Sequence, residues 1–216
     1  MINFEAIIRH FWQRAVEDVE RDHAAYDENA LKVLGEENAS NRRDTIRDWF
    51  QAYRVFRVRG IGAQRNEIVD AFLKWVDSRD RERNLDTAAA LSDAHKELET
   101  LICNAYTRNS QNKAREFTSL TSKALWLCYP DKVPMFDGHA QRALWVLAKL
   151  EIGIATPPNG PDADDKYFQF VSVWKHFYGK YLAEISNLDT NGYPYRVRVF
   201  DRILWLIGKE QYTVSA

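Results

Sequence analysis

The sequence predicts an all-α protein, and three of its features support that prediction. Apolar residues recur at three- and four-residue steps along most of the chain, which is the period of one helix face. No long segment alternates apolar and polar side chains as a half-buried strand would. Residues that begin or end helices stand between the periodic stretches. We therefore expect about eight helices in one domain spanning residues 1–216, built as one body or as two lobes with a cleft between them.

The first helix is expected over residues 3–34. Its inner face is formed by apolar residues at helical spacing: Phe4, Ile8, Phe11, Ala15, Val19 and Tyr26. Gly35 can end this helix. Ser40 or Asn41 can cap a second helix. The predicted inner face of that second helix consists of Ile46, Trp49, Phe50 and Tyr53.

Residues 54–65 interrupt the helical period and include two glycines, which indicates a turn. Asn66 can cap the helix that follows. A glycine turn beside a helix N-terminus can bind an anion, or it can be a simple loop between helices. Both readings stay open for this segment.

Further along the chain, residues 78–84 form a charged loop, and Asp86 is expected to cap a helix that runs to Tyr106. After the central stretch, residues 155–165 are rich in proline and glycine and predict a loop. An aromatic-rich helix then extends to about residue 187. A turn at Asn191 and Gly192 leads into a last helix, which Gly208 is expected to close.

Residues 117–150 read as a short helix, a turn bounded by prolines and a second helix. Pro130 and Pro134 end the first helix because a residue before proline is disfavoured in the α region. Asp137 stands at the N-cap position of the second helix. Lys123 lies on the first helix, so an amine and a carboxylate can meet across the turn.

This stretch resembles the catalytic hairpin of the helix-hairpin-helix DNA glycosylases, the superfamily that includes 8-oxoguanine DNA glycosylase. Residues 119–123, Ser-Leu-Thr-Ser-Lys, match the hairpin and its lysine, and residues 133–137, Val-Pro-Met-Phe-Asp, match the proline and aspartate. His139 and Ala140 continue the likeness. The hairpin glycines of the family are replaced here, and the segment between lysine and aspartate is shorter. The resemblance covers about 35 of the 216 residues.

The resemblance implies two catalytic residues. Lys123 would attack the sugar carbon as the base leaves, forming a Schiff base, and an apolar surrounding would favour the neutral amine that this step needs. Asp137 would stabilise the positive charge that develops on the sugar. A solvated lysine and an N-cap worth about 1 kcal/mol are the structural alternatives.

Two groups of residues are candidates for holding the DNA backbone. Polar residues of the hairpin and of the helix after it could bind phosphates, or simply cap helices and lie on the surface: Ser119, Thr121, Ser122, His139 and Arg142. The second group is the arginine-rich segment with Arg54, Arg57 and Arg59. Residues 42–65 have a net charge of +5, whereas residues 1–41 have a net charge of −5, and a phosphate backbone responds to the local field.

An extruded base would need aromatic faces and a polar group. The aromatic candidates are Trp126, Trp174, Tyr178 and Trp205, although aromatic residues at helical spacing are more often part of a core. Asp201 is the polar candidate, because it stands in an otherwise apolar helix. Its alternative role, which we favour, is an ion pair with Arg198 or Arg202.

Composition excludes several classes of protein. The chain is 45% hydrophobic and 28% charged with a net charge of −1, as in ordinary globular proteins. Its two cysteines are far apart and its five histidines are dispersed, so no metal and no cofactor is expected. It shows no signal peptide, no membrane-spanning run, no P-loop and no dinucleotide fingerprint. We expect a cytoplasmic monomer.

The leading hypothesis is a DNA N-glycosylase, with or without AP-lyase activity, that excises a damaged or hypermodified base in DNA repair or anti-phage defence. A second hypothesis is a non-catalytic nucleic-acid-binding or defence-associated module on the same scaffold. A third is an all-helical protein–protein adaptor, in which the arginine run would not respond to DNA. The identity of the base is not encoded in any motif.

Overall fold

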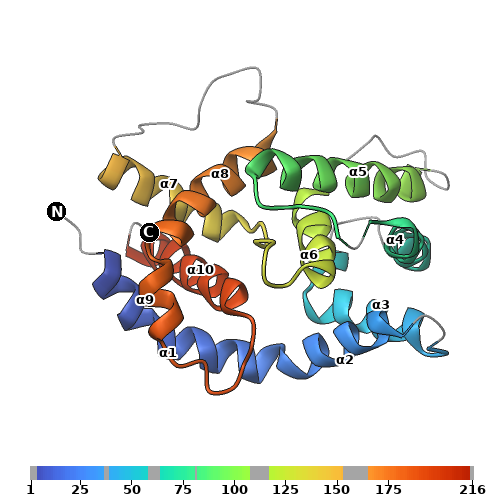
Figure 1. Cartoon of the computed structure of the whole chain (residues 1–216), viewed down its shortest axis with the longest axis horizontal. Coiled ribbons are helices and arrows are strands. Elements are labelled where there is room, and N and C mark those ends of the chain that lie inside the picture. Colours follow the sequence, from blue (N-terminus) through green and yellow to red (C-terminus); the bar gives the residue numbers. More distant parts are fainter. Residues whose placement is uncertain are drawn as a thin grey trace.

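The computed structural model describes residues 4–36, 39–57, 64–80, 82–107, 117–152 and 165–214 (Figure 1). These residues form ten α-helices, one 3₁₀ turn and no strand, so the prediction of an all-α protein is confirmed. The helices are α1 (Phe4–Asp22), α2 (Ala24–Gly35), α3 (Arg42–Ala52), α4 (Arg65–Ser78), α5 (Ala88–Thr107), α6 (Thr118–Cys128), α7 (Gly138–Ile152), α8 (Lys166–Lys180), α9 (Leu182–Asn187) and α10 (Arg196–Val214), with the 3₁₀ turn η1 at Val55–Arg57.

The expected number of helices was too low because two long helical segments are each broken once. His23 separates α1 from α2, at a backbone φ of −137°. Backbone hydrogen bonds from His23 N to Val19 O and from Asp27 N to His23 O continue across the break, both at 2.9 Å. The two helices therefore follow one another along one edge of the molecule (Figure 1). Tyr181 separates α8 from α9 in the same way.

Several predicted helix ends are confirmed and others move by a few residues. Gly35 is the last residue of α2, and Asn41 occupies the N-cap position of α3. The N-cap of α4 is Gln64, so Asn66 lies inside that helix. Thr87, not Asp86, caps α5, because its hydroxyl accepts a hydrogen bond from Ala90 N at 3.1 Å. Each shift has the same cause: several residue types can occupy an N-cap, so neighbouring candidates compete.

The prediction that Gly208 closes the last helix is wrong, because α10 continues to Val214. Gly208 instead permits a close crossing of α10 over the start of α7. A Cβ atom added at Gly208 would lie 1.9 Å from the carbonyl oxygen of His139. This position must therefore lack a side chain, and the crossing brings the middle of α10 against the residues that precede α7.

Helix α6 lies in the middle of the fold, between α5 on one side and α2 on the other. The predicted inner faces of α3 and α6 are buried. Trp126 of α6 is 0% exposed and stacks on Trp49 of α3, with 6.2 Å between ring centroids. Two residues predicted for the first inner face differ from the rest. Phe11 is only half-buried, and Tyr26 is 47% exposed.

The turn before α10 is as predicted. Asn191 and Gly192 have φ values of 51° and 90°, both in the left-handed region that a tight turn requires. The predicted loop at residues 155–165 lies outside the described residues except for Asp165, the N-cap of α8. None of the described helices is both long and apolar enough to cross a bilayer.

Candidate functional site

A cavity of about 960 Å³, called the central cavity below, lies where six helices meet. The residues that line it come from the α1–α2 break, the end of α3, α6, the connector before α7, the start of α7, and α10. They are Arg21, Asp22, His23, Tyr26, Ala52, Tyr53, Arg54, Ser119, Lys123, Met135, Asp137, His139, Arg198, Asp201, Arg202, Trp205 and Lys209. Its volume is within the range of ligand pockets.

Lys123 and Asp137 line the same cavity, as the spacing across the proline-bounded turn predicts. Within the described residues, their charged ends do not form an ion pair at 4.0 Å or less. Burial lowers the pKa of Lys123 to about 8, while Asp137 acts to raise it and Arg198 to lower it further. A substantial fraction of the Lys123 amine is therefore neutral near pH 8.

Asp137 caps α7, which confirms its predicted structural role. Its Oδ1 accepts a hydrogen bond from His139 N at 2.8 Å, and its carbonyl oxygen accepts one from Gln141 N at 2.8 Å. The side chain is half-buried at the cavity wall. A carboxylate has two oxygens with room for about four hydrogen bonds, so capping leaves acceptor capacity facing the cavity.

The connector that carries Asp137 is held from three sides. Asp201 Oδ2 accepts from Met135 N at 2.7 Å, and Ser122 Oγ accepts from Phe136 N at 2.9 Å. Tyr167 donates its phenol to Pro134 O at 3.2 Å. These bonds join the connector to α10, α6 and α8, so the position of the carboxylate is fixed by three separate helices.

Asp201 is buried and does not form the predicted ion pair with Arg198 or Arg202. Its Oδ1 accepts from Trp174 Nε1 at 2.7 Å, while its other oxygen holds Met135 N. Burial raises the pKa of Asp201 to about 7, against the lowering effect of the Met135 hydrogen bond. The ion-pair prediction was wrong because burial placed a backbone donor and an indole closer to Asp201 than either arginine.

His139 lines the cavity, and Arg142 fixes its ring. Arg142 Nη2 lies 2.7 Å from His139 Nδ1. A guanidinium can only donate, so Nδ1 is the acceptor, and neutral His139 carries its proton on Nε2. The ring meets Trp205 edge to face at 5.4 Å. Arg142, predicted to contact DNA, is instead half-buried against His139 and does not line the cavity.

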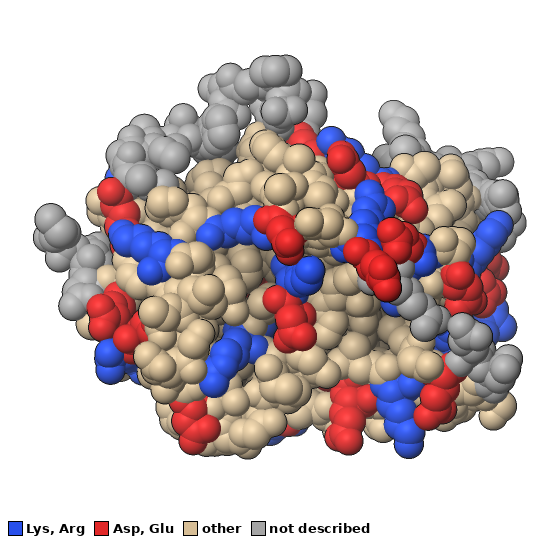
Figure 2. Space-filling model, in the orientation of Figure 1, with Lys and Arg blue, Asp and Glu red and all other residues tan. Residues whose placement is uncertain are grey.

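The cavity is rich in cations although the whole chain is slightly acidic. Six Lys or Arg residues line it, against three Asp residues. Figure 2 shows that both signs of charge are interspersed over the face drawn there, without a single broad basic field. Positive charge is therefore concentrated in a concave site, where it attracts an anion most strongly.

Arg54 belongs to the cavity, and its backbone is unusual. It follows the end of α3 with φ of 57°, in the left-handed region that side chains other than glycine rarely adopt. The carbonyl of Gln51 accepts a hydrogen bond from Arg54 N at 2.9 Å, which closes the helix end. Of the other two predicted arginines, the side chain of Arg57 and the whole of Arg59 lie outside the described residues.

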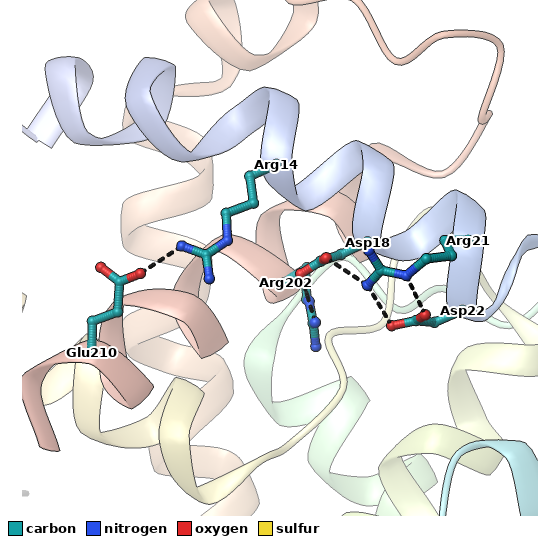
Figure 3. Close-up of polar contacts among 6 residues, drawn as sticks. All are labelled: Arg14, Asp18, Arg21, Asp22, Arg202 and Glu210. Carbon is teal, nitrogen blue, oxygen red and sulfur yellow. Dashed lines mark hydrogen bonds and ion pairs between the residues drawn. The ribbon is translucent and has the colours of Figure 1, made fainter. Parts of the chain in front are cut away.

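Ion pairs between α1 and α10 form the rim of the cavity (Figure 3). Arg202 of α10 donates through Nη2 and Nε to Asp18 Oδ2, at 2.6 and 3.0 Å. Arg21 bridges Asp18 and Asp22 on α1, with both distances at 2.8 Å. The guanidinium carbon of Arg202 also lies 4.2 Å from the ring centroid of Trp205. The rim is therefore a neutralised network, and its arginines are already engaged.

His23, Tyr53 and Arg198 form the wall opposite the connector, and the sequence did not single them out. The rings of His23 and Tyr53 stack at 4.3 Å. Burial lowers the pKa of His23 to about 3, and Arg198 lowers it further, so this imidazole is neutral. Its place at a helix break and the cationic Arg198 on an apolar helix were the available signals. Neither has meaning until α2 and α10 are brought together.

Five predicted site residues do not line the cavity. Thr121 and Ser122 are both 0% exposed, so their hydroxyls have no surface from which to reach a phosphate. The fully buried Trp126 belongs to the core, and Trp174 with Tyr178 forms a stack, 4.5 Å between centroids, behind Asp201. Ser119, Trp205 and Asp201 do line it. The aromatic prediction failed where helical spacing meant a core face.

Within the described residues, no three His, Cys, Asp or Glu side chains come together as ligands for a metal. Comparison of the chain with protein-family models, curated proteins and solved structures finds no match. The functional interpretation therefore rests on the cavity itself and on the hairpin motif.

Proposed function

We propose that this protein is a DNA N-glycosylase that excises a damaged or hypermodified base, with AP-lyase capacity through Lys123. The observation that carries the proposal is the presence of Lys123, with its lowered pKa, and Asp137 on the wall of one cavity. These are the two residues that the hairpin motif assigns to this chemistry. The resemblance to helix-hairpin-helix glycosylases is part of the proposal.

In the proposed reaction, the neutral amine of Lys123 attacks C1′ of the extruded nucleotide. The bond between C1′ and the base nitrogen breaks, and its electron pair leaves with the base, which takes up a proton. Burial of Lys123 supports this role, because it favours the form with a free lone pair. The resulting Schiff base is the species that borohydride can trap.

Asp137 stabilises the positive charge that develops on the sugar ring as the base departs. Its position is fixed by the cap of α7 and by the hydrogen bonds that hold the connector. A carboxylate held in place before the reaction needs no reorganisation when charge develops. Capping and charge stabilisation therefore support one another.

The remaining walls suit a nucleotide. Cations such as Arg54 and Lys209 can attract phosphate, and Trp205 and Tyr53 offer aromatic faces for a base. Ser119 and His139 supply further hydrogen-bonding groups beside the catalytic pair. Asp201 contributes by holding Met135 and can still offer a lone pair to a base.

A non-catalytic nucleic-acid-binding module is the competing function. The observation that favours it is the hydrogen bond from His139 N to Asp137 Oδ1, which already gives the carboxylate a structural role. Under this alternative, Lys123 and the other cations bind DNA without breaking a bond. The two functions differ in whether free base is released.

The deciding experiment is release of free base from a panel of DNAs, read by mass spectrometry. The panel contains duplexes with oxidised or alkylated bases and phage genomes with hypermodified bases. In parallel, borohydride trapping on abasic DNA tests for the covalent intermediate. No released base from any DNA, together with no trapped complex, would reject the glycosylase in favour of the binding module.

Two variants separate the catalytic roles. Lys123→Gln should abolish trapping and keep DNA binding, whereas Asp137→Asn should lower base release by ~10² or more, since a fixed charge aimed at a transition state is worth several kcal/mol. Asparagine still caps a helix, so Asp137→Asn should melt close to wild type. Lys149→Gln, an exposed lysine on α7, is the matched control. Base release that survives only in Lys123→Gln indicates a monofunctional enzyme in which Asp137 activates a water.

A further inference from the structure

Arg198 differs from the other partly or fully buried arginines of the described chain in how its guanidinium is satisfied. Arg202 makes two hydrogen bonds to Asp18, and Arg196 donates to two backbone carbonyls at 2.7 and 2.6 Å. Arg42 pairs with Asp77 at 2.7 Å. In each case a carboxylate or a carbonyl accepts from a terminal nitrogen, as is expected for a buried cation.

Arg198 is only 8% exposed, yet its one hydrogen bond within the described residues is a long one. It runs from Nε to the phenol oxygen of Tyr53 at 3.3 Å. The guanidinium also lies 5.2 Å from the centre of the Tyr53 ring. These two contacts use the inner edge and one face of the group. The two terminal nitrogens, with four N–H donors, have no partner in the described chain.

The surroundings keep Arg198 charged and in place. Asp27 is fully buried behind it and holds Tyr53 through hydrogen bonds of 2.7 and 3.0 Å to the phenol. Tyr53 in turn holds Nε of Arg198. No carboxylate comes within ion-pair distance of Arg198 in the described residues, although both Asp27 and Asp201 interact with it electrostatically. A fixed cation is thus presented to the cavity with its donors unused.

Unused donors on a buried guanidinium are costly unless a ligand or water accepts from them. The planar fork matches two kinds of acceptor pair: two oxygens of a phosphate, or the adjacent oxygen and nitrogen on the edge of a nucleobase. Lys123 and Asp137 line the same cavity, so a group held by Arg198 would lie within the same enclosed space as the proposed chemistry.

We infer that Arg198 is the anchoring residue of the central cavity and donates two parallel hydrogen bonds to a paired acceptor on the bound ligand. This rests on the proposed function only in taking the ligand to be a nucleotide. The acceptor pair belongs either to the phosphate or to the base edge, and the experiment below separates these sources.

Calorimetric titration of the full chain with three small probes tests the inference. Deoxyguanosine monophosphate carries both acceptor pairs, deoxyguanosine carries only the base edge, and inorganic phosphate carries only the oxyanion. Wild-type protein should bind the nucleotide, and Arg198→Gln should weaken that binding about tenfold or more, as expected for loss of charge-assisted hydrogen bonds. Arg14→Gln, an exposed arginine paired with Glu210 outside the cavity, should bind like wild type.

The single-source probes identify the acceptor. Dependence on Arg198 that persists with deoxyguanosine assigns the base edge, and dependence that persists with phosphate assigns the oxyanion. Arg198→Lys keeps the charge and removes the fork, so paired acceptance predicts a loss with this variant as well. Tyr53→Phe keeps the arginine and loosens its Nε, and a smaller loss is expected. These two variants retain the test if Arg198→Gln does not fold.

Nucleotide binding by Arg198→Gln and Arg198→Lys that equals wild type would overturn the inference, as would a wild-type protein that binds none of the three probes at millimolar concentration. The outcome is independent of base release. Arg198-dependent binding without base release would reject the glycosylase and keep the anchor, and base release without Arg198-dependent binding would do the reverse.

Discussion

Asp27 and Asp201 are both buried carboxylates that accept a hydrogen bond from a tryptophan Nε1 at 2.7 Å, but they hold different parts of the molecule. Asp27 accepts from side chains only: Trp49, Tyr53 and Tyr193. Asp201 accepts from Trp174 and from a backbone N–H of the connector. Burial raises the pKa of both carboxyls.

The difference lies in what each carboxylate positions. Asp27 does not line the cavity, and it joins α2, α3 and the turn before α10 into the wall behind Arg198. Asp201 lines the cavity and fixes Met135, two residues before Asp137. Two similar groups therefore have separable roles, one in the stability of the fold and one in the geometry of the site.

The largest expected effect is on stability, from Asp27→Ala. This change leaves two phenols and an indole without an acceptor in a buried site and removes a negative charge near Arg198, so the free energy of unfolding should fall by about 3–5 kcal/mol. Urea unfolding measures it. Asp93→Ala, at an exposed carboxylate, should stay within about 0.5 kcal/mol of wild type. Equal unfolding of the two variants would contradict a central role for Asp27.

Gly208→Ala tests how strongly the Asp201 side depends on the crossing of α7 and α10. A Cβ atom would lie 1.9 Å from His139 O, so a backbone must move and stability should fall by about 1–3 kcal/mol or more. Gly179 of α8 is the matched control, because a Cβ atom there meets nothing within 4 Å. Gly179→Ala should leave stability unchanged or raise it by up to about 1 kcal/mol. Thermal melts of both variants check the pair, and equal melts would remove the close crossing as the explanation.

Asp201→Asn should alter the site more than the fold. Its amide can accept through one oxygen only, so either Met135 N or Trp174 Nε1 loses its partner, at about 1–3 kcal/mol of stability. Base release per folded molecule should fall about tenfold or more, because the connector is no longer fixed. Asp27→Asn should lose stability and keep its activity per folded molecule. If the two asparagine variants lose activity equally, the division of roles does not hold.

The pH dependence of stability should separate the two sides most finely, by at most about 1.4 kcal/mol per pH unit for each group. The folded pKa of Asp201 is raised to about 7, so its contribution is present at low pH and is lost as pH rises towards 7. The folded pKa of His23 is lowered to about 3, so stability falls as pH drops below 6.5. Urea midpoints from pH 4 to 8 should therefore change slope in opposite directions in Asp201→Asn and His23→Gln. Parallel slopes would exclude one of the two titrations.

The sequence predicted the features that depend on neighbours along the chain. Lys123 and Asp137 could be paired because two prolines bound the turn between them, and Asp137 has the residue type and position of an N-cap. The all-α class followed from periodicity over long segments. Helix ends were less certain because Gln64 and Thr87 compete with nearby polar residues.

What could not be predicted depends on packing between distant segments. His23 and Arg198 meet only when α2 and α10 are brought together, and no local pattern encodes that meeting. Gly208 shows the same limit in one residue, since a glycine that ends a helix and one that permits a close crossing look alike in sequence. Trp126 and Trp174 were assigned to the site because aromatic residues serve cores and pockets equally well.

The left-handed backbone of Arg54 has a consequence for directed evolution of this protein. Glycine adopts that conformation without the steric penalty of about 1–2 kcal/mol that a side chain carries. A library screened for heat resistance alone would therefore enrich Arg54→Gly, and each enriched clone would lack a cation at the cavity. Screens for robustness and for ligand affinity should move this position in opposite directions, so it identifies a residue where the two selections conflict.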